Sequence, residues 1–303
     1  MTAPHPGETT WTLDQLDRWT FAGTPLAVLG HPIAHSLSPR MHNAALAAMA
    51  ATNPAFATWR YCRFDVPPDR LPEALERLHA IGLHGLNLTV PHKVLAFDRV
   101  AEIDPAARAI GAVNTLRRTP TGWRGFNTDG YGLATALREE LGVRLAGATV
   151  ILLGAGGAAR GAAVECLQQG CAALWIANRT RANLDALLAD LRPLAGPAAL
   201  HGFDPAAPPA DLPAGALLVN ATSAGLKPGE PAPIDLRRLP ADLSVYDMVY
   251  NPPQTALLRD AATRGLRHAN GLSMLVHQGA RALELWTGAA VPADVMRAAL
   301  ATP

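Results

Sequence analysis

The sequence predicts an α/β protein built from two domains, with parallel sheets covered by helices. Its length of 303 residues exceeds the usual size of one domain and suffices for two cores. Hydrophobic residues make up 49% of the chain and charged residues 17%, which describes a compact globular protein. The run from Thr149 to Leu153 is wholly apolar, as expected of a buried parallel strand, and it stops abruptly at glycines.

A glycine-rich turn follows this strand, in the stretch ATVILLGAGGAARG at residues 148–161. A helical apolar pattern comes next, and a second apolar run at 172–177 completes a strand, helix and strand unit of about 30 residues. In such a unit the glycines let the backbone turn tightly and approach a pyrophosphate, which the free N–H groups of the helix bind. The pattern therefore predicts a Rossmann-type, doubly wound domain that binds a dinucleotide through Gly154, Ala155, Gly156, Gly157 and Ala158.

The end of the second strand predicts which nucleotide is bound. An NAD site normally has an acidic residue there for the ribose 2′-hydroxyl, whereas this chain has Asn178-Arg179-Thr180-Arg181 and no acid before Asp185. Guanidinium groups are planar, charged donors that suit a 2′-phosphate, so NADP is the expected cofactor. The alternative is a basic turn that is merely solvated.

A polar loop at residues 31–39 follows the first expected strand, at 25–30. Ser38 followed by Pro39 predicts the start of a helix, with the Ser38 hydroxyl at the N-cap and the proline at the first helical position. Because helix starts attract anions, we expect Ser36 and Ser38 to hold a small carboxylate, although capping alone would also explain Ser38.

Residues 85–93, GLNLTVPHK, combine polar side chains with an apolar strand pattern. Asn87 and Thr89 alternate with leucines, so both share one face of a short strand. Pro91 begins the next expected helix and places Lys93 in its first turn. A cation there interacts unfavourably with the helix dipole, at a cost of about 0.3–1 kcal/mol. The positive end of the helix eases loss of the lysine proton, as general acid–base chemistry requires; the alternative is a solvated lysine.

Two further polar positions lie near the expected domain boundary. Asn114 falls in a predicted strand at 112–116, and Asp129 precedes a long predicted helix that reaches Leu141. Asp129 is either an acid favoured by the helix dipole or part of a substrate site, since clefts form where domains join.

The other expected elements are a short helix at 11–19 begun by Thr12, a strand at 61–66, a helix at 67–80 with Leu71, Leu75 and Leu78 inward, a turn at 119–122, a helix at 183–191, strands at 198–203, 216–220 and 243–249, and helices from Gly271 onward.

Charge and composition exclude several classes of protein. The formal net charge is +1, so nothing favours a nucleic-acid or membrane surface as partner. Cys62, Cys166 and Cys171 are too few and too far apart for a disulfide framework or a zinc site, and His31 and His35 suit hydrogen bonding better than a metal. The N-terminus lacks a signal-peptide pattern, and no apolar run approaches about 18 residues. We expect a cytoplasmic protein without a metal, as a monomer or homodimer.

Seven motifs occur in order along the chain: GHPIAHSLSP at 30–39, NLTVPHK at 87–93, AVNT at 112–115, NTDG at 127–130, GAGGAAR at 154–160, NRT at 178–180 and NATSAG at 220–225. With these motifs the chain closely resembles the shikimate dehydrogenase family from Gly30 to about Trp286. The resemblance implies NADP-dependent interconversion of 3-dehydroshikimate and shikimate, a step of aromatic amino-acid biosynthesis. It also implies a substrate-binding α/β domain (1–128 plus 272–303) and a Rossmann domain (129–271), with a cleft between them.

The resemblance implies roles for individual residues as well. Lys93 and Asp129 match the family's catalytic pair, and Ser36 and Ser38 match the serines that hold the substrate carboxylate. The substrate hydroxyls are expected to contact Asn87, Thr89, Asn114, Asp129 and Gln278, with Tyr250 bordering the substrate. The cofactor is expected to contact the glycine-rich turn, Asn178, Arg179, Thr180, Arg181, Thr222, Met248 and Gly271, with Thr222 and Met248 at the nicotinamide.

The chain departs from the family pattern at two positions. Asn183 stands where the pattern NRT-x-x-[RK] has a second basic residue, although Arg181 lies nearby as a substitute. His31 stands where the family more often has Asp or Asn. Two alternatives stay open: a quinate/shikimate dehydrogenase with a broader substrate range or NAD use, and a non-catalytic NADP-sensing module on the same fold.

Overall fold

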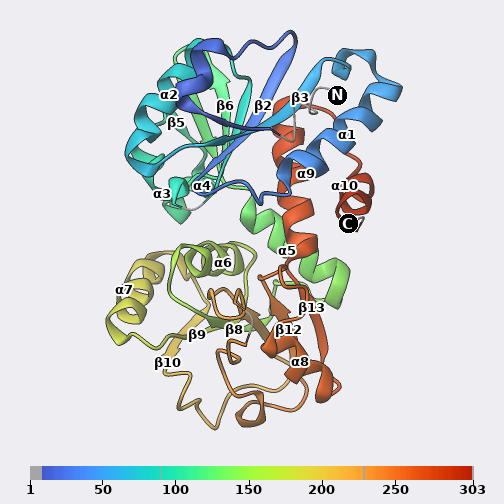
Figure 1. The fold of residues 1–303 in the computed structure, drawn as a ribbon. Coiled ribbons are helices and arrows are strands. Elements are labelled where there is room, and N and C mark those ends of the chain that lie inside the picture. Colours follow the sequence, from blue (N-terminus) through green and yellow to red (C-terminus); the bar gives the residue numbers. More distant parts are fainter. Residues whose placement is uncertain (1–8, 90, 228, 302–303) are drawn as a thin grey trace. The chain divides into compact units, whose positions relative to one another are not determined.

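The computed structural model describes residues 9–89, 91–227 and 229–301 and divides the chain into two compact units (Figure 1). The first unit comprises Met1–Thr128 and Gln278–Pro303, and the second comprises Asp129–His277. The chain therefore passes from the first unit to the second and back again. Its return comes after His277, later than the expected position at 271, because helix α9 (Leu272–Thr287) runs without a break through this point.

The described strands of the first unit are β1 (Thr10–Thr12), β2 (Thr24–Gly30), β3 (Trp59–Asp65), β4 (Gly85–Leu88), β5 (Glu102–Ile103), β6 (Thr115–Thr119) and β7 (Gly122–Phe126). They form a seven-stranded sheet in the order β1-β3-β2-β4-β6-β7-β5. Strands β1, β3, β2 and β4 run parallel, whereas β6 is antiparallel to both of its neighbours. The hairpin of β6 and β7 confirms the expected turn at 119–122.

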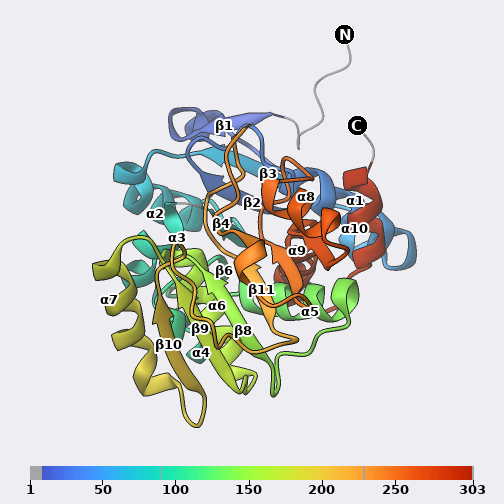
Figure 2. The same cartoon turned by 90° about the horizontal axis from the view of Figure 1, so that it is seen from below.

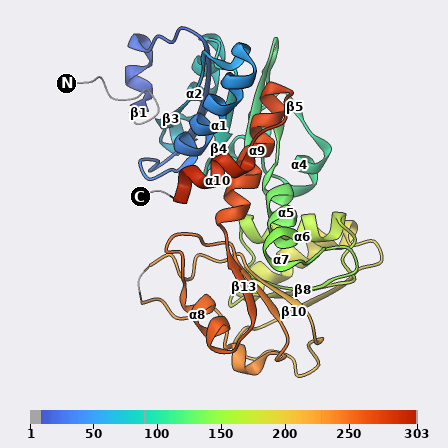
Figure 3. The same ribbon diagram turned by 90° about the vertical axis from the view of Figure 1, so that its right-hand side faces the viewer.

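The described helices that belong wholly to the first unit are α1 (Ser38–Thr52), α2 (Leu71–Ala80), α3 (His92–Leu95), α4 (Pro105–Ile110) and α10 (Ala293–Ala301), with 3-10 turns at Leu13–Arg18, Pro54–Phe56, Pro68–Arg70 and Phe97–Arg99. The C-terminal helix α10 packs beside α1, as Figures 1 and 3 show. Helix α2 buries Leu71, Leu75 and Leu78 as predicted, in one core with Leu86 and Val113. Burial of the apolar faces of helix and sheet thus fixes the strands whose ends carry polar residues.

The described strands of the second unit are β8 (Thr149–Leu153), β9 (Ala173–Ala177), β10 (Ala199–Phe203), β11 (Leu217–Asn220), β12 (Ser244–Asp247) and β13 (Arg267–Asn270). They form a six-stranded parallel sheet in the order β10-β9-β8-β11-β12-β13 (Figure 2). Chain order therefore runs outward from β8 on one side and from β11 on the other, which is the doubly wound Rossmann order. Its described helices are α5 (Asp129–Leu141), α6 (Gly157–Gln168), α7 (Arg181–Leu191), α8 (Ala256–Thr263) and the start of α9, with 3-10 turns at Arg192–Leu194 and Leu236–Arg238.

Three expected elements differ from the structure. The helix expected at 11–19 is strand β1 followed by a 3-10 turn, because Thr10–Thr12 pair with the open edge of β3. The strand expected at 112–116 begins only at Thr115, since the Val113 N–H donates to the Lys93 carbonyl and leaves the sheet pattern. The helix expected at 183–191 begins earlier, at Arg181. In the described part of the chain, no helix is both long and apolar enough to cross a bilayer.

Candidate active site

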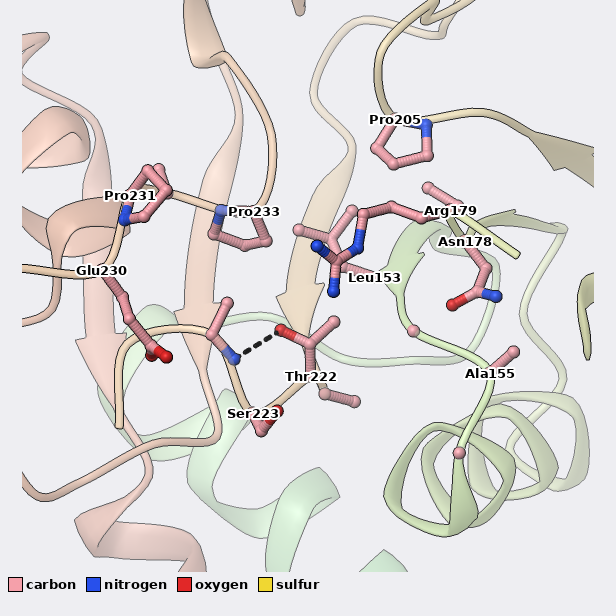
Figure 4. Close-up of a pocket in the computed structure, with 16 residues that line it drawn as sticks. Leu153, Ala155, Asn178, Arg179, Pro205, Thr222, Ser223, Glu230, Pro231 and Pro233 are labelled. Carbon is pink, nitrogen blue, oxygen red and sulfur yellow. Dashed lines mark hydrogen bonds between the residues drawn. The ribbon is translucent and has the colours of Figure 1, made fainter. Parts of the chain in front are cut away.

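The second unit holds a cavity of about 500 Å³ at the carboxyl ends of β8, β9 and β11 (Figure 4). The order of the sheet reverses between β8 and β11, so the cavity lies at the switch point where doubly wound sheets bind ligands. Of the residues expected to bind the cofactor, six are among those that line this cavity: Gly154, Ala155, Gly156, Asn178, Arg179 and Thr222. Outside this lining lie Gly157, Ala158, Thr180, Arg181, Met248 and Gly271.

The glycine-rich turn leaves one wall of the cavity bare. Gly154 has a φ of +111°, and a Cβ there would lie 3.2 Å from the Ala221 carbonyl oxygen. A Cβ on Gly156 or Gly157 would meet no atom within 4 Å. Gly156 also occupies the N-cap of α6 and provides no side chain to accept from the first N–H groups of the helix. Unfilled space beside uncapped N–H groups fits the pyrophosphate of a dinucleotide.

Charge in the cavity comes from two side chains. Among the described lining residues, Arg179 is the only cation and Glu230 the only acid, and Figure 4 shows the Arg179 guanidinium extending into the cavity. Glu230 accepts from the Gly225 N–H at 2.8 Å, and such backbone donors hold the pKa of its carboxyl below the usual value. The Arg181 Nε donates instead to Asp185 Oδ2 at 2.9 Å, one turn further along α7. The structure thus gives Arg181 a protein partner and leaves Arg179 facing the cavity.

A buried polar chain that the sequence reasoning missed holds Thr222 in the cavity wall. The Thr222 N–H and hydroxyl donate to Asn220 Oδ1 at 3.0 and 2.7 Å. Asn220 Nδ2 donates to Asp247 Oδ1 at 2.9 Å, and the Thr255 hydroxyl donates to Asp247 Oδ2 at 2.6 Å. Burial raises the pKa of the Asp247 carboxyl, although these hydrogen bonds oppose the shift. The signal in the sequence was a polar residue at the last position of each of two apolar strands.

Met248 and Gly271 lie against each other after β12 and β13. A Cβ on Gly271 would lie 2.1 Å from the Met248 carbonyl oxygen, so only glycine permits this approach of two backbones. The Gly271 N–H also donates to the Val249 carbonyl at 3.2 Å. Tyr250 follows closely and is partly buried, which raises the pKa of its phenol. The close approach to the Met248 backbone gives a structural reason for glycine at position 271, whereas its contact with the cofactor stays a prediction.

In the first unit, neighbouring strands hold the start of the loop that carries the two serines. A Cβ on Gly30 would lie 2.3 Å from Thr89 Cγ2, so a glycine at the end of β2 lets Thr89 approach the chain. His31 Nδ1 pairs with Asp65 Oδ1 at 2.6 Å, which ties the loop to the end of β3. Within the described residues, no cluster of three or more His, Cys, Asp or Glu side chains could hold a metal ion.

The start of α1 corrects the predicted cap. The helix begins at Ser38 with Leu37 at the N-cap position and no side-chain cap bond. Ser36 Oγ instead accepts from the Ser38 N–H at 3.3 Å. A serine side chain can accept in this way from the backbone N–H two residues later. The two serines therefore contact each other at this helix start.

Asn87 and Asn114 belong to one buried network in the first unit. Asn87 Nδ2 donates to the Asn114 carbonyl at 3.1 Å and to Thr115 Oγ1 at 3.0 Å. Asn114 Oδ1 accepts from the Thr128 N–H at 2.8 Å, and Asn114 Nδ2 donates to Gln278 Oε1 at 3.4 Å. The network thus brings together three residues predicted to bind substrate hydroxyls. The bond to Gln278 is the longest of these.

Known proteins are similar in sequence to this chain over most of its length. A curated shikimate dehydrogenase (NADP(+)) from Symbiobacterium thermophilum is 45% identical over 281 residues, which cover 91% of this chain and 93% of that protein. The chain belongs to the shikimate dehydrogenase family. The model of the shikimate dehydrogenase substrate binding domain matches residues 28–116, and that of the shikimate 5′-dehydrogenase C-terminal domain matches residues 271–301.

Two solved structures extend the comparison. The shikimate 5-dehydrogenase of Thermus thermophilus, in complex with NADP(H) and shikimate, is 36% identical with a TM-score of 0.78, and the match covers 91% of this chain and 98% of that chain. The quinate dehydrogenase of Corynebacterium glutamicum, in complex with NAD, is 29% identical with a TM-score of 0.80, covering 92% and 99%. Proteins of this fold thus include one that binds NADP(H) with shikimate and one that binds NAD and is named for quinate.

The two residues predicted to form a catalytic pair occupy defined backbone positions. Lys93 lies in the single turn of α3, which the Ala96 N–H closes by donating to the His92 carbonyl at 2.9 Å. The Val113 N–H donates to the Lys93 carbonyl at 2.9 Å, so the lysine backbone is held from the neighbouring segment. Asp129 is the first residue of α5 in the second unit, where the helix dipole favours a carboxylate.

Proposed function

We propose that this protein catalyses the reversible reduction of 3-dehydroshikimate to shikimate with NADPH. The observation that carries the proposal is the cavity of the second unit, where uncapped N–H groups, open space over Gly156 and the Arg179 guanidinium meet at the switch point of a doubly wound sheet. The membership in a family whose curated relatives are NADP(+)-dependent supports the same cofactor and substrate.

The residues of the second unit are assigned to the cofactor. The N–H groups at the start of α6 bind the pyrophosphate, Arg179 binds the 2′-phosphate, and the Asn220 and Asp247 chain keeps Thr222 in place. When bound, NADP(H) supplies or accepts the hydride of the reaction. All other chemistry falls to side chains of the protein.

The remaining predicted residues are assigned to the substrate. Ser36 and Ser38 at the start of α1 hold the carboxylate, and the network of Asn87, Asn114 and Gln278, with Thr89, holds ring hydroxyls, with Tyr250 at the border. Lys93 exchanges the proton at the 3-oxygen as hydride transfer occurs, and Asp129 orients that hydroxyl.

Steady-state oxidation of shikimate and of quinate, each with NADP+ and with NAD+, tests the proposal. The readout is the absorbance of the reduced nicotinamide. Turnover confined to shikimate with NADP+ is expected. Comparable turnover of quinate, or with NAD+, assigns the protein to a broader dehydrogenase instead. Binding of NADP without turnover in any pairing overturns the enzymatic proposal in favour of a sensing module.

A further inference from the structure

The residue that precedes Lys93 anchors the turn on which the lysine lies. Helix α3 has four residues, all within the described part of the chain, and His92 is the buried one among them. Its side chain is fully buried, whereas Val94 and Leu95 are 58% and 42% exposed. A single turn is too short to be stable as an isolated helix, and its exposed apolar side chains gain little from burial. The contacts of His92 therefore contribute much of what holds this turn in place.

A hydrogen bond joins the His92 side chain to a distant segment of the first unit. Its Nε2 lies 2.8 Å from the Val66 carbonyl oxygen. The carbonyl can only accept, so Nε2 carries the proton and is the donor. Burial lowers the pKa of His92, which favours the neutral imidazole, and Nδ1 has no hydrogen-bond partner among the described residues. The bond to Val66 thus fixes the orientation of the ring.

Val66 is a firm point of attachment for this ring. It follows β3 directly, and its N–H donates to the Gly30 carbonyl at the end of β2 at 3.0 Å. Its side chain is fully buried in the core of the first unit, together with Ala96, which follows α3. Because the Val66 backbone is held between the ends of two sheet strands, its carbonyl gives the His92 ring a fixed partner.

Two backbone hydrogen bonds hold the same turn from other segments. The His92 N–H donates to the Thr89 carbonyl at 2.8 Å, and the Lys93 carbonyl accepts from the Val113 N–H at 2.9 Å. The ring of His92 adds a side-chain contact from a third direction in the chain, at Val66. Since a side chain can be substituted and a backbone group cannot, this bond is the one by which the sequence adjusts the position of the Lys93 backbone.

A histidine beside an acid–base lysine is itself an ordinary candidate for proton transfer. The His92 ring is fully buried, however, and its Nε2 proton is bound to a backbone carbonyl. We propose that His92 is a positioning residue for Lys93, whose ring fixes the turn from which the lysine reaches the substrate by donating to the Val66 carbonyl. The inference rests on the proposed function, because it takes Lys93 as the group that exchanges the proton. Displacing a reacting group by about 1 Å costs about 100-fold in rate, so the effect falls on kcat.

Three substitutions separate the donor of His92 from its ring. His92→Gln carries an amide nitrogen at about the reach of imidazole Nε2, His92→Asn carries the same amide on a shorter side chain, and His92→Phe keeps a ring without an N–H. For shikimate oxidation with NADP+, we expect kcat to fall about 10- to 100-fold in the Asn and Phe variants and to stay within about threefold of the wild type in the Gln variant. KM for shikimate is expected to change less than about threefold in all of them. A kcat in the Gln variant no higher than in the other two overturns the positioning role.

The pH profile distinguishes positioning from proton transfer. Glutamine does not titrate, so His92→Gln is expected to keep the wild-type pH dependence of kcat/KM if His92 only holds the turn. Loss of an ionisation from the profile of this variant shows that the imidazole itself exchanges a proton, which overturns the inference.

Hydrogen exchange followed by mass spectrometry measures the anchor without turnover. Exchange of the backbone N–H groups of residues 92–97 is expected to be about three- to tenfold faster in His92→Asn than in His92→Gln. Equal exchange overturns the anchor. A wild-type protein that shows no turnover of shikimate, while its variants show this difference, refutes the proposed function and leaves the anchor standing.

Nitrogen NMR of the unmodified protein tests the same bond without any variant that must fold. The His92 imidazole is expected to carry its proton at Nε2 and to have a bare Nδ1 at neutral pH. A proton on Nδ1 with a bare Nε2 is incompatible with donation to Val66 and overturns the inference.

Discussion

Arg179→Gln tests how the second unit distinguishes NADP from NAD. Among the described residues of the cavity lining, Arg179 is the only cation, and Arg181 is engaged by Asp185. The substitution removes the guanidinium while keeping a polar, though shorter, side chain. The structure therefore predicts that the 2′-phosphate loses its principal charged partner.

The expected magnitude follows from the environment of Arg179. A hydrogen bond to a charged group contributes about 1.5–3 kcal/mol, and an exposed guanidinium lies at the lower end because water competes for it. A loss of about 1.5–2 kcal/mol raises KM for NADP+ about 10- to 30-fold. KM for NAD+, which lacks the 2′-phosphate, is expected to change less than about twofold.

The assay is the initial rate of shikimate oxidation at saturating shikimate with each cofactor in turn. Arg181→Gln serves as the matched control, because it removes a guanidinium two residues away that already has a carboxylate partner. It is expected to change KM for NADP+ less than about threefold. An equal rise in KM for NADP+ and NAD+ in Arg179→Gln would show that the residue shapes the loop and does not bind the 2′-phosphate.

Three further changes probe other parts of the molecule. Lys93→Ala is expected to lower kcat for shikimate by about 10²–10⁴ with an unchanged circular dichroism spectrum, and a smaller loss in folded protein refutes proton transfer by this lysine. Gly271→Ala places a Cβ 2.1 Å from the Met248 carbonyl oxygen, so we expect the free energy of unfolding to fall by about 1–3 kcal/mol and Tm to fall with it. An unchanged Tm in thermal unfolding contradicts the close approach. Burial raises the pKa of Glu165 in α6, so the folded state favours the protonated acid, and this contribution to stability is lost as pH rises through the raised pKa. Glu165→Gln is therefore expected to raise Tm at pH 8 more than at pH 4, and the reverse order refutes this sign.

The sequence was sufficient for features that depend on neighbours in the chain. The apolar run Thr149–Leu153 and the glycines after it predicted β8, the turn and α6, because strand, turn and helix signals lie within a few residues of one another. Spacing likewise predicted the buried face of α2 and the helix that begins at Asp129. Local patterns were less reliable at element ends, as the start of α1 shows: Ser38 was expected at the N-cap, but it is the first helical residue, and its N–H donates to Ser36 Oγ.

Only the tertiary structure decided which polar groups meet. His31 lies 34 residues from its partner Asp65, and Tyr61 lies 26 residues from Asn87, so no local pattern connects either pair. The sequence by itself determined the two-domain α/β class, the dinucleotide turn and the residue types available for chemistry, because these follow from short-range periodicity and backbone preference. Which side chains share a buried site, and which way their protons point, depends on strand register and on backbone donors and acceptors that only packing brings into contact.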